Sequence, residues 1–220
     1  IVLNTWDYKG VAEYRDVQRE AKAAHAKYGI MTHFGRVFAI MVEKNSELPV
    51  GDKLRKYKGR VVFQGNLVKD QNWDVAMFQE SSSAPATMAG SKTADFYGTL
   101  YGNIIQQADA TQAYTQAKLE GDPTWVRLPR DQWPPEWEGI TDPVCHWDLA
   151  LYGHPLSGAY WERHCEKHLK AQGFKPVDSW RSCFWHPDHK AYLVIYVDDF
   201  KLAGPPKGVA ACWDLITSPN

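Results

Sequence analysis

Three aspartates are the residues in this sequence best suited to metal chemistry. Asp198 and Asp199 are adjacent at the end of an apolar run, and Asp109 ends a second apolar run earlier in the chain. Adjacent carboxylates repel each other unless a cation lies close to both. Carboxylate oxygens are hard ligands that suit Mg²⁺. The pattern indicates a site for a divalent cation, although a solvated turn is the simpler interpretation of the Asp-Asp pair taken alone.

The segments around these aspartates have the pattern of short strands joined by turns. Residues 183–186 and 191–196 predict two strands on either side of a Pro-Asp-His-Lys turn. A second turn, at Asp198 and Asp199, leads into residues 200–203. Residues 103–108 predict a further strand that ends at Asp109, and a second strand end with a carboxylate would complete a metal site. A helix is expected at about 158–172.

The first part of the chain predicts a helix followed by a β-hairpin. Residues 11–27 are rich in strong helix formers, and this helix should end near Gly29. Strands are expected at 33–43 and 56–63, with turn residues at 45–51 between them. The return strand begins in a basic cluster, which is also a common way to protect an edge strand. The other expected elements are a helix at 92–101, a polar loop at 131–142 and a final helix at 209–216.

Composition is that of an ordinary globular protein. Of 220 residues 44% are hydrophobic, and 25 basic against 26 acidic side chains give a net charge of -1. No overall field attracts nucleic acid or an anionic membrane, so any polyanion site must be local. No apolar run approaches the roughly 20 residues of a membrane helix. With no secretory leader either, we expect an intracellular protein that is not secreted and has no membrane partner.

Cysteines and chain ends add two expectations. The four cysteines have irregular spacing and no CxxC pair, which argues against a disulfide framework or a zinc ribbon. The chain starts at Ile1 and stops at Asn220 without an obvious closing element, so we expect a segment of a longer polypeptide.

Four separated motifs resemble those of reverse transcriptases, in both order and spacing. Tyr-Val-Asp-Asp at 196–199 resembles the YxDD signature in the form that retroelements use. Asp109, followed five positions later by Tyr114, resembles the family's first palm motif. Residues 151–161 and 57–65 are similar to the LYG…W segment and the YKARLVARG fingers strand of copia-type long-terminal-repeat retrotransposons. The resemblance spans about residues 53–204.

This resemblance implies an α+β fingers-palm fold, in which an antiparallel palm sheet packs on helices. The implied fingers cover about residues 1–100 and 119–150, and the implied palm covers about 101–118 and 151–216, without a thumb or ribonuclease H. The implied activity is that of an RNA-directed DNA polymerase, a nucleotidyltransferase that uses dNTPs and an RNA or DNA template with a primer. The implied partners are the rest of the retrotransposon polyprotein, including integrase and ribonuclease H, in a cytoplasmic particle or the nucleus.

The family's functional residues carry over to matching positions of this sequence. Asp109, Asp198 and Asp199 would be the catalytic ligands of two Mg²⁺ ions, with Mn²⁺ as an alternative. Arg60 would reach the incoming triphosphate, where a guanidinium donates two hydrogen bonds, and Lys58 is a weaker candidate. The remaining implied positions are Ala110, Thr111, Tyr114 and Leu156 at the nucleotide, and Tyr152, Gly153, Tyr196 and Val197 at the template and primer. Leu156 stands where the family usually carries Gln.

Three alternatives stay open on the sequence. A catalytically inactive, nucleic-acid-binding relic of the same fold would keep these motifs without activity. Trp133, Trp137 and Trp147, near a Pro-rich loop, could instead line a carbohydrate or peptide groove, although such aromatics are more often core anchors. The third alternative is a zinc site on His154, His164, Cys165 and His168.

Overall fold

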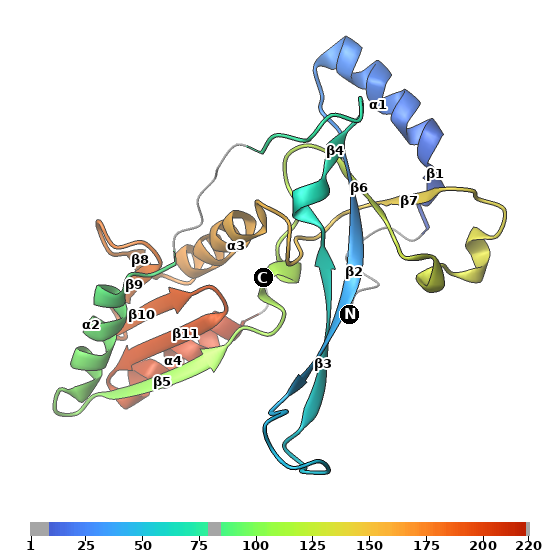
Figure 1. The fold of residues 1–220 in the computed structure, drawn as a ribbon. Coiled ribbons are helices and arrows are strands. Elements are labelled where there is room, and N and C mark those ends of the chain that lie inside the picture. Colours follow the sequence, from blue (N-terminus) through green and yellow to red (C-terminus); the bar gives the residue numbers. More distant parts are fainter. Residues whose placement is uncertain (1–8, 79–84, 219–220) are drawn as a thin grey trace. The chain divides into compact units, whose positions relative to one another are not determined.

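The computed structural model describes residues 9–78 and 85–218 and contains two compact units (Figure 1). The first unit comprises residues 1–79 and 118–157, and the second comprises 80–117 and 158–220. Within these described ranges the chain forms four helices and two sheets, so the α+β class predicted from the sequence is confirmed. No helix in the ranges given above is both long and apolar enough to cross a bilayer.

The elements follow one another in chain order within each unit. The first unit holds β1 (Ala12–Glu13), α1 (Tyr14–Tyr28), β2 (His33–Lys44), β3 (Lys56–Phe63), β4 (Lys69–Asp70), β6 (Thr124–Arg127) and β7 (Pro143–His146), with 3-10 turns η2 (Gly65–Leu67), η4 (Arg130–Gln132) and η5 (Pro135–Trp137). The second holds α2 (Met88–Thr99), β5 (Ile104–Asp109), η3 (Ala113–Gln116), α3 (Ser157–Ala171), β8 (Lys175–Pro176), β9 (Cys183–His186), β10 (Ala191–Tyr196), β11 (Asp199–Gly204) and α4 (Pro206–Thr217).

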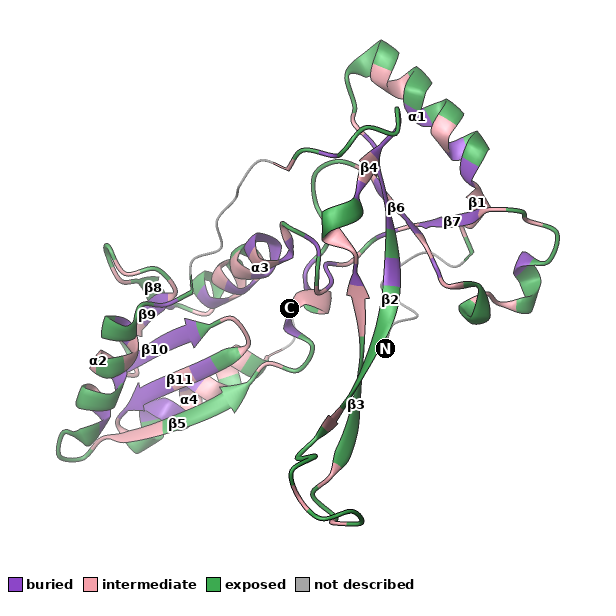
Figure 2. Ribbon diagram, in the orientation of Figure 1, coloured by how far each residue is buried: buried purple, intermediate pink, exposed green. Residues whose placement is uncertain are grey.

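In the first unit, β2 is long enough to join two different pairings. Its first residues pair in parallel with β6, with His33 opposite Thr124, and the sheet order is β1-β7-β6-β2-β3. Its later residues pair antiparallel with β3, from Val37 opposite Phe63 to Lys44 opposite Lys56. This distal hairpin was predicted from the sequence. Figure 2 shows that this hairpin is largely exposed, since residues 38–42 of β2 and 56–60 of β3 are exposed.

Local sequence explains where the elements of the first unit begin and end. Helix α1 stops at Gly29, which takes a left-handed backbone (φ 71°) and donates its N–H to the carbonyl of His25 at 2.9 Å. A left-handed C-terminal residue is the usual place for glycine. The core beneath the sheet gathers Phe63, Val126, Trp137 and Trp147. This core secures the base of the exposed hairpin, since Phe63 is the last residue of β3.

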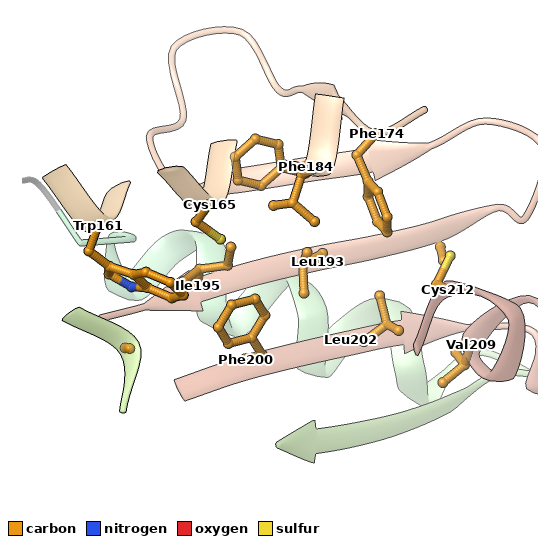
Figure 3. Packing of buried hydrophobic residues seen from close by; sticks show 13 residues of the cluster. Trp161, Cys165, Phe174, Phe184, Leu193, Ile195, Phe200, Leu202, Val209 and Cys212 are labelled. Carbon is orange, nitrogen blue, oxygen red and sulfur yellow. The ribbon is translucent and has the colours of Figure 1, made fainter. Parts of the chain in front are cut away.

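The second unit is built on one antiparallel sheet in the order β5-β11-β10-β9-β8. Side chains alternate between its two faces, as the pleat requires. One face packs against α3 and α4, where Leu193, Ile195, Phe200 and Leu202 meet Trp161 and other helical residues (Figure 3). The opposite face packs against α2, where Ala94 belongs to one buried cluster with Tyr192, Val194 and Ala203. Because both faces are buried over the middle of the sheet, its register is strongly fixed.

The unit boundaries differ from the expected fingers-palm boundaries. Helix α2 packs on the sheet of the second unit, whereas the resemblance assigns it to the fingers. Residues 151–157 belong to the first unit, whereas the resemblance assigns them to the palm. Both differences follow from packing: α2 covers one sheet face, and residues 152–153 bond and pack against the end of β3. Parts of the expected fingers, residues 1–8 and 79–84, lie outside the described residues.

His154 is a buried histidine of the first unit with an environment of aromatic rings. Only 7% of it is exposed, and its ring centre lies 5.5 Å from Phe63, 5.2 Å from Phe78 and 5.3 Å from Trp147. Its Nδ1 accepts the backbone N–H of Leu156 at 3.2 Å. Burial, with a smaller effect of His33, lowers the pKa of His154 from 6.5 to about 4. A neutral imidazole is therefore part of the folded state at neutral pH.

The first unit should lose stability as the pH falls below 6.5. The folded-state pKa of His154 lies below its unfolded value, so the stabilising contribution is complete above pH 6.5 and is lost toward about pH 4. A shift of this size corresponds to about 3 kcal/mol when fully expressed. His154→Gln should flatten the fall of the unfolding temperature between pH 6.5 and 4. A slope in His154→Gln that equals the slope in the wild type would contradict the assignment.

Candidate active site

The antiparallel register of the second unit places two predicted metal ligands face to face. Asp109, the last residue of β5, lies directly opposite Asp199, the first residue of β11. Directly opposed residues of antiparallel strands project to the same face, with Cβ atoms about 4.5–5.5 Å apart. The pairing extends into the turn, because the N–H of Ala110 donates to the carbonyl of Asp198 at 2.7 Å. All three aspartates therefore lie at one end of the sheet.

The turn that carries Asp198 has an unusual backbone. Tyr196 pairs with Asp199, which leaves Val197 and Asp198 as a two-residue turn, and Val197 has φ 59°. A positive φ at the first central residue is typical of a type II′ turn, where glycine is preferred. For a β-branched residue this backbone is a steric outlier and costs about 1–3 kcal/mol. Something in the surrounding structure must hold the turn in this form.

Trp161 of α3 provides such a restraint. Its indole Nε1 donates to the carbonyl of Val197 at 2.7 Å, and its side chain is buried in the core that includes Ile195 and Phe200 (Figure 3). The indole N–H is the only hydrogen-bond donor of a tryptophan side chain, and the packing of the ring in the core directs this donor toward the turn. The sequence identified Trp161 as part of the LYG…W segment but gave no signal of this hydrogen bond. The positive φ of Val197 was likewise not predicted.

Tyr114 lies close enough to the turn to sense its charge. Burial, and to a lesser degree the negative charge of Asp198, raise the pKa of the Tyr114 hydroxyl. Its side chain is half-buried and packs on the core beneath the sheet. The core role that the sequence also allowed is thus observed, and the proximity to Asp198 is compatible with a role at the site.

Two hollows of the second unit share Asp109 in their walls. One, of about 500 Å³, is also lined by Ala110, Thr111 and Gln116. The other, of about 620 Å³, is lined by Tyr196, Asp199 and residues of α2. Volumes of this size accommodate small ligands. Of the predicted nucleotide contacts, Ala110, Thr111 and Tyr114 therefore lie in the same unit as the three aspartates.

The donor set fits Mg²⁺ in its chemistry. Asp109 and Asp199 are exposed and Asp198 is half-exposed, so water molecules could fill the remaining coordination positions that Mg²⁺ usually keeps. Throughout 9–78 and 85–218, however, no group of three His, Cys, Asp or Glu side chains is arranged to hold an ion. A shared ion would require a rotamer change at these aspartates. Such changes cost little for exposed side chains.

The predicted phosphate contacts lie on the exposed hairpin of the first unit. Arg60 is opposite Ile40 and Lys58 is opposite Val42, so both cations share one face of the ribbon with apolar side chains. Both cations are exposed. They are not in the same unit as the aspartates, so their pairing with the site stays a prediction.

The other predicted contacts of the first unit surround the end of β3. The N–H of Phe63 donates to the carbonyl of Tyr152 at 2.7 Å. Gly153 has φ 93°, and a side chain there would collide with the carbonyl of Phe63. The missing side chain thus serves this approach of two chain segments, whereas the sequence argument used it for approach to a nucleotide. Leu156 is half-buried, and its contact with a nucleotide stays a prediction.

The residues considered for a sugar-binding groove and for a zinc site lie in surroundings that differ from those such sites need. Trp137 and Trp147 are 2% and 1% exposed and belong to the core, which removes them from any sugar-binding groove. His168 Nε2 bonds to the carbonyls of Leu215 and Ile216, and burial raises the pKa of the Cys165 thiol to about 12. His154 lies in the other unit.

Comparison with known proteins adds no identification. No protein-family model matches the chain, and no curated protein matches it.

Removing one of the facing charges should stabilise the protein in the absence of divalent cations. Asp199→Asn abolishes repulsion with Asp109 and should raise the free energy of unfolding of the second unit by about 0.5 kcal/mol in EDTA at low salt. Addition of Mg²⁺ should favour the wild type instead. Asp188→Asn, at the β9–β10 turn, is the matched control and should show neither effect. Urea unfolding measures both, and a destabilised Asp199→Asn in EDTA would contradict the repulsion.

Loss of the indole hydrogen bond should loosen the strained turn. Trp161→Phe keeps an aromatic ring and should cost about 1 kcal/mol, while hydrogen exchange at the amides of Asp198 and Asp199 becomes faster. Trp213→Phe removes a comparable bond to the Gln106 side chain and is the control. If the two variants exchange at these amides equally fast, Trp161 does not restrain the turn.

Proposed function

We propose that this chain is the fingers-palm part of a retrotransposon reverse transcriptase, an RNA-directed DNA polymerase. One observation carries the proposal: Asp109 lies directly opposite Asp199, and the neighbouring Asp198 belongs to a strained turn. A strained backbone and like charges on directly opposed residues are both costly, and proteins retain such features mainly at functional sites. The Tyr-Val-Asp-Asp motif and the three other motifs that resemble copia-type enzymes give this site its chemical meaning.

The aspartates are proposed as the ligands of two Mg²⁺ ions. When bound, such ions supply positive charge to the attacking and leaving oxygens of phosphoryl transfer. Asp109 and Asp198 would contribute to both ion sites, and Asp199 would support the site on the primer side. Ala110 and Thr111 follow Asp109 directly and would present backbone groups to the triphosphate of the incoming dNTP.

Selection and positioning of the nucleotide would fall to side chains near the turn and on the hairpin. Tyr114, close to Asp198, would pack under the sugar and exclude a 2′-hydroxyl. Arg60 would bind the triphosphate in a bidentate way, and Lys58 would add positive charge. A primed RNA or DNA template would lie along Tyr152, Gly153, Tyr196 and Val197. The remainder of the polyprotein would supply integrase and ribonuclease H.

The inactive relic is the second candidate, and Leu156 is the observation that favours it. An apolar leucine stands where the related enzymes usually carry glutamine, so the nucleotide would lose a polar contact at this position. The two candidates share nucleic-acid binding and differ only in chemistry.

Single-nucleotide extension of a DNA primer on an RNA template tests the proposal. The wild-type chain should add a dNTP in the presence of Mg²⁺, and Asp198→Asn should reduce the rate by at least about a hundredfold because a metal ligand loses its charge. Asp188→Asn should retain the activity. Tight primer-template binding without extension would replace the proposal by the relic, and absence of both binding and extension would reject the two together.

A further inference from the structure

His186, at the end of β9, has one ring nitrogen without a partner. The residue is 4% exposed, and its Nε2 bonds to the carbonyl of Gln172 at 3.1 Å. A carbonyl can only accept, so Nε2 carries a proton, and the neutral form of the ring bears its lone pair on Nδ1. This Nδ1 is buried and has no hydrogen-bond partner. A buried lone pair without a donor is costly, and such an exception calls for an explanation.

His189 places a second imidazole beside it. The two ring centres are 4.5 Å apart and the rings are inclined by 40°, so they are not stacked in parallel. With metal–nitrogen bonds of about 2.0–2.1 Å, two imidazoles on one ion have ring centres roughly 4.5–5.5 Å apart. The observed separation falls within that range. His189 is half-exposed whereas Nδ1 of His186 is buried, so a cation would approach the pair from the side of His189.

The turn that joins the two histidines is held from both sides. The Tyr97 hydroxyl of α2 donates to the carbonyl of Lys190 at 2.9 Å. On the other side, Gly208 of α4 packs so closely on the backbone of His189 that a side chain at position 208 would collide with its carbonyl. Pro187 fixes one further backbone angle of the turn. A site on this turn is therefore preorganised, which lowers the entropic cost of binding.

We propose that His186 and His189 form a binding site for a borderline divalent cation such as Zn²⁺. Nδ1 of His186 and one ring nitrogen of His189 are the protein ligands, and water completes the coordination. The bond from Nε2 to the Gln172 carbonyl is the outer-sphere support that metal-bound histidines usually have. Imidazole nitrogens suit Zn²⁺ and disfavour Mg²⁺, so this site is chemically distinct from the three aspartates.

A cation at this place would act on stability. The cation would link the end of β9 to the turn before β10, which Tyr97 of α2 and Gly208 of α4 hold from either side. It would not contact the proposed catalytic residues. Binding to the folded state alone would stabilise the second unit in proportion to the logarithm of the ion concentration. The proposal does not depend on the proposed polymerase activity.

Titration of the whole chain with ZnCl2 in an excess of Mg²⁺ tests this site. Mg²⁺ occupies the carboxylates, and calorimetry should then report one Zn²⁺ per chain together with a rise of a few degrees in the unfolding temperature. His189→Gln, at a half-exposed position that tolerates substitution, should weaken binding at least about tenfold by removal of one ligand.

His164→Gln is the matched control, since it removes another half-exposed histidine of the same unit. This variant should bind Zn²⁺ as the wild type does. A change of the His186 Nδ1 resonance on addition of Zn²⁺, seen by ¹⁵N NMR, identifies the ligand atom in the wild type without any mutation. Equal Zn²⁺ affinities of the wild type and His189→Gln, or an unchanged Nδ1 resonance, would overturn the proposal.

Discussion

The register of β5 on β11, which sets Asp109 opposite Asp199, is the constraint on which the candidate site of the second unit depends. These residues face each other because β5 and β11 pair in one register, and a shift by a single residue would turn one carboxylate to the other face. The hydrophobic core prevents such a shift. Ile104 and Ile105 of β5 pack against the cores on the two faces of the sheet, and Ile105 lies close against Gly98 of α2, so sliding β5 along β11 would break both contacts. The energy of the core thus maintains an arrangement that the charges alone oppose.

The turn beside these carboxylates stores a second cost. Val197 adopts a left-handed backbone that disfavours a β-branched side chain, and the indole of Trp161 bonds to its carbonyl. Since Trp161 is anchored in the same core as Phe200, one packing layer fixes both the register and the turn. The unit therefore fixes the backbone positions of the acidic residues, while their side chains must still change rotamer to share an ion. The proposed phosphoryl transfer would need this backbone to place negative charge near the metal ions.

The sequence predicted the elements with strong local signals. The apolar run at 191–196 and the Pro-Asp-His-Lys turn predicted β9 and β10 correctly, and strand β3 has the predicted bounds. The short strands β6 and β7 were not predicted, because four residues carry too little periodicity and the parallel pairing of β2 with β6 joins distant segments. The sequence predicted only that carboxylates lie at two strand ends, and not that Asp109 lies directly opposite Asp199. The roles of Trp161 and His186 depend on tertiary contacts that no local pattern encodes.

Paramagnetic broadening by Mn²⁺ tests most directly whether the three carboxylates share a cation. Mn²⁺ prefers the same oxygen ligands as Mg²⁺ and broadens the NMR signals of nearby nuclei. Substoichiometric Mn²⁺ should broaden the amides of residues 109–111 and 197–199 together, at one common affinity, and added Mg²⁺ should reverse the effect. If only one of these two segments broadens, or if they respond with different affinities, the carboxylates do not form a single site and the account of this unit fails.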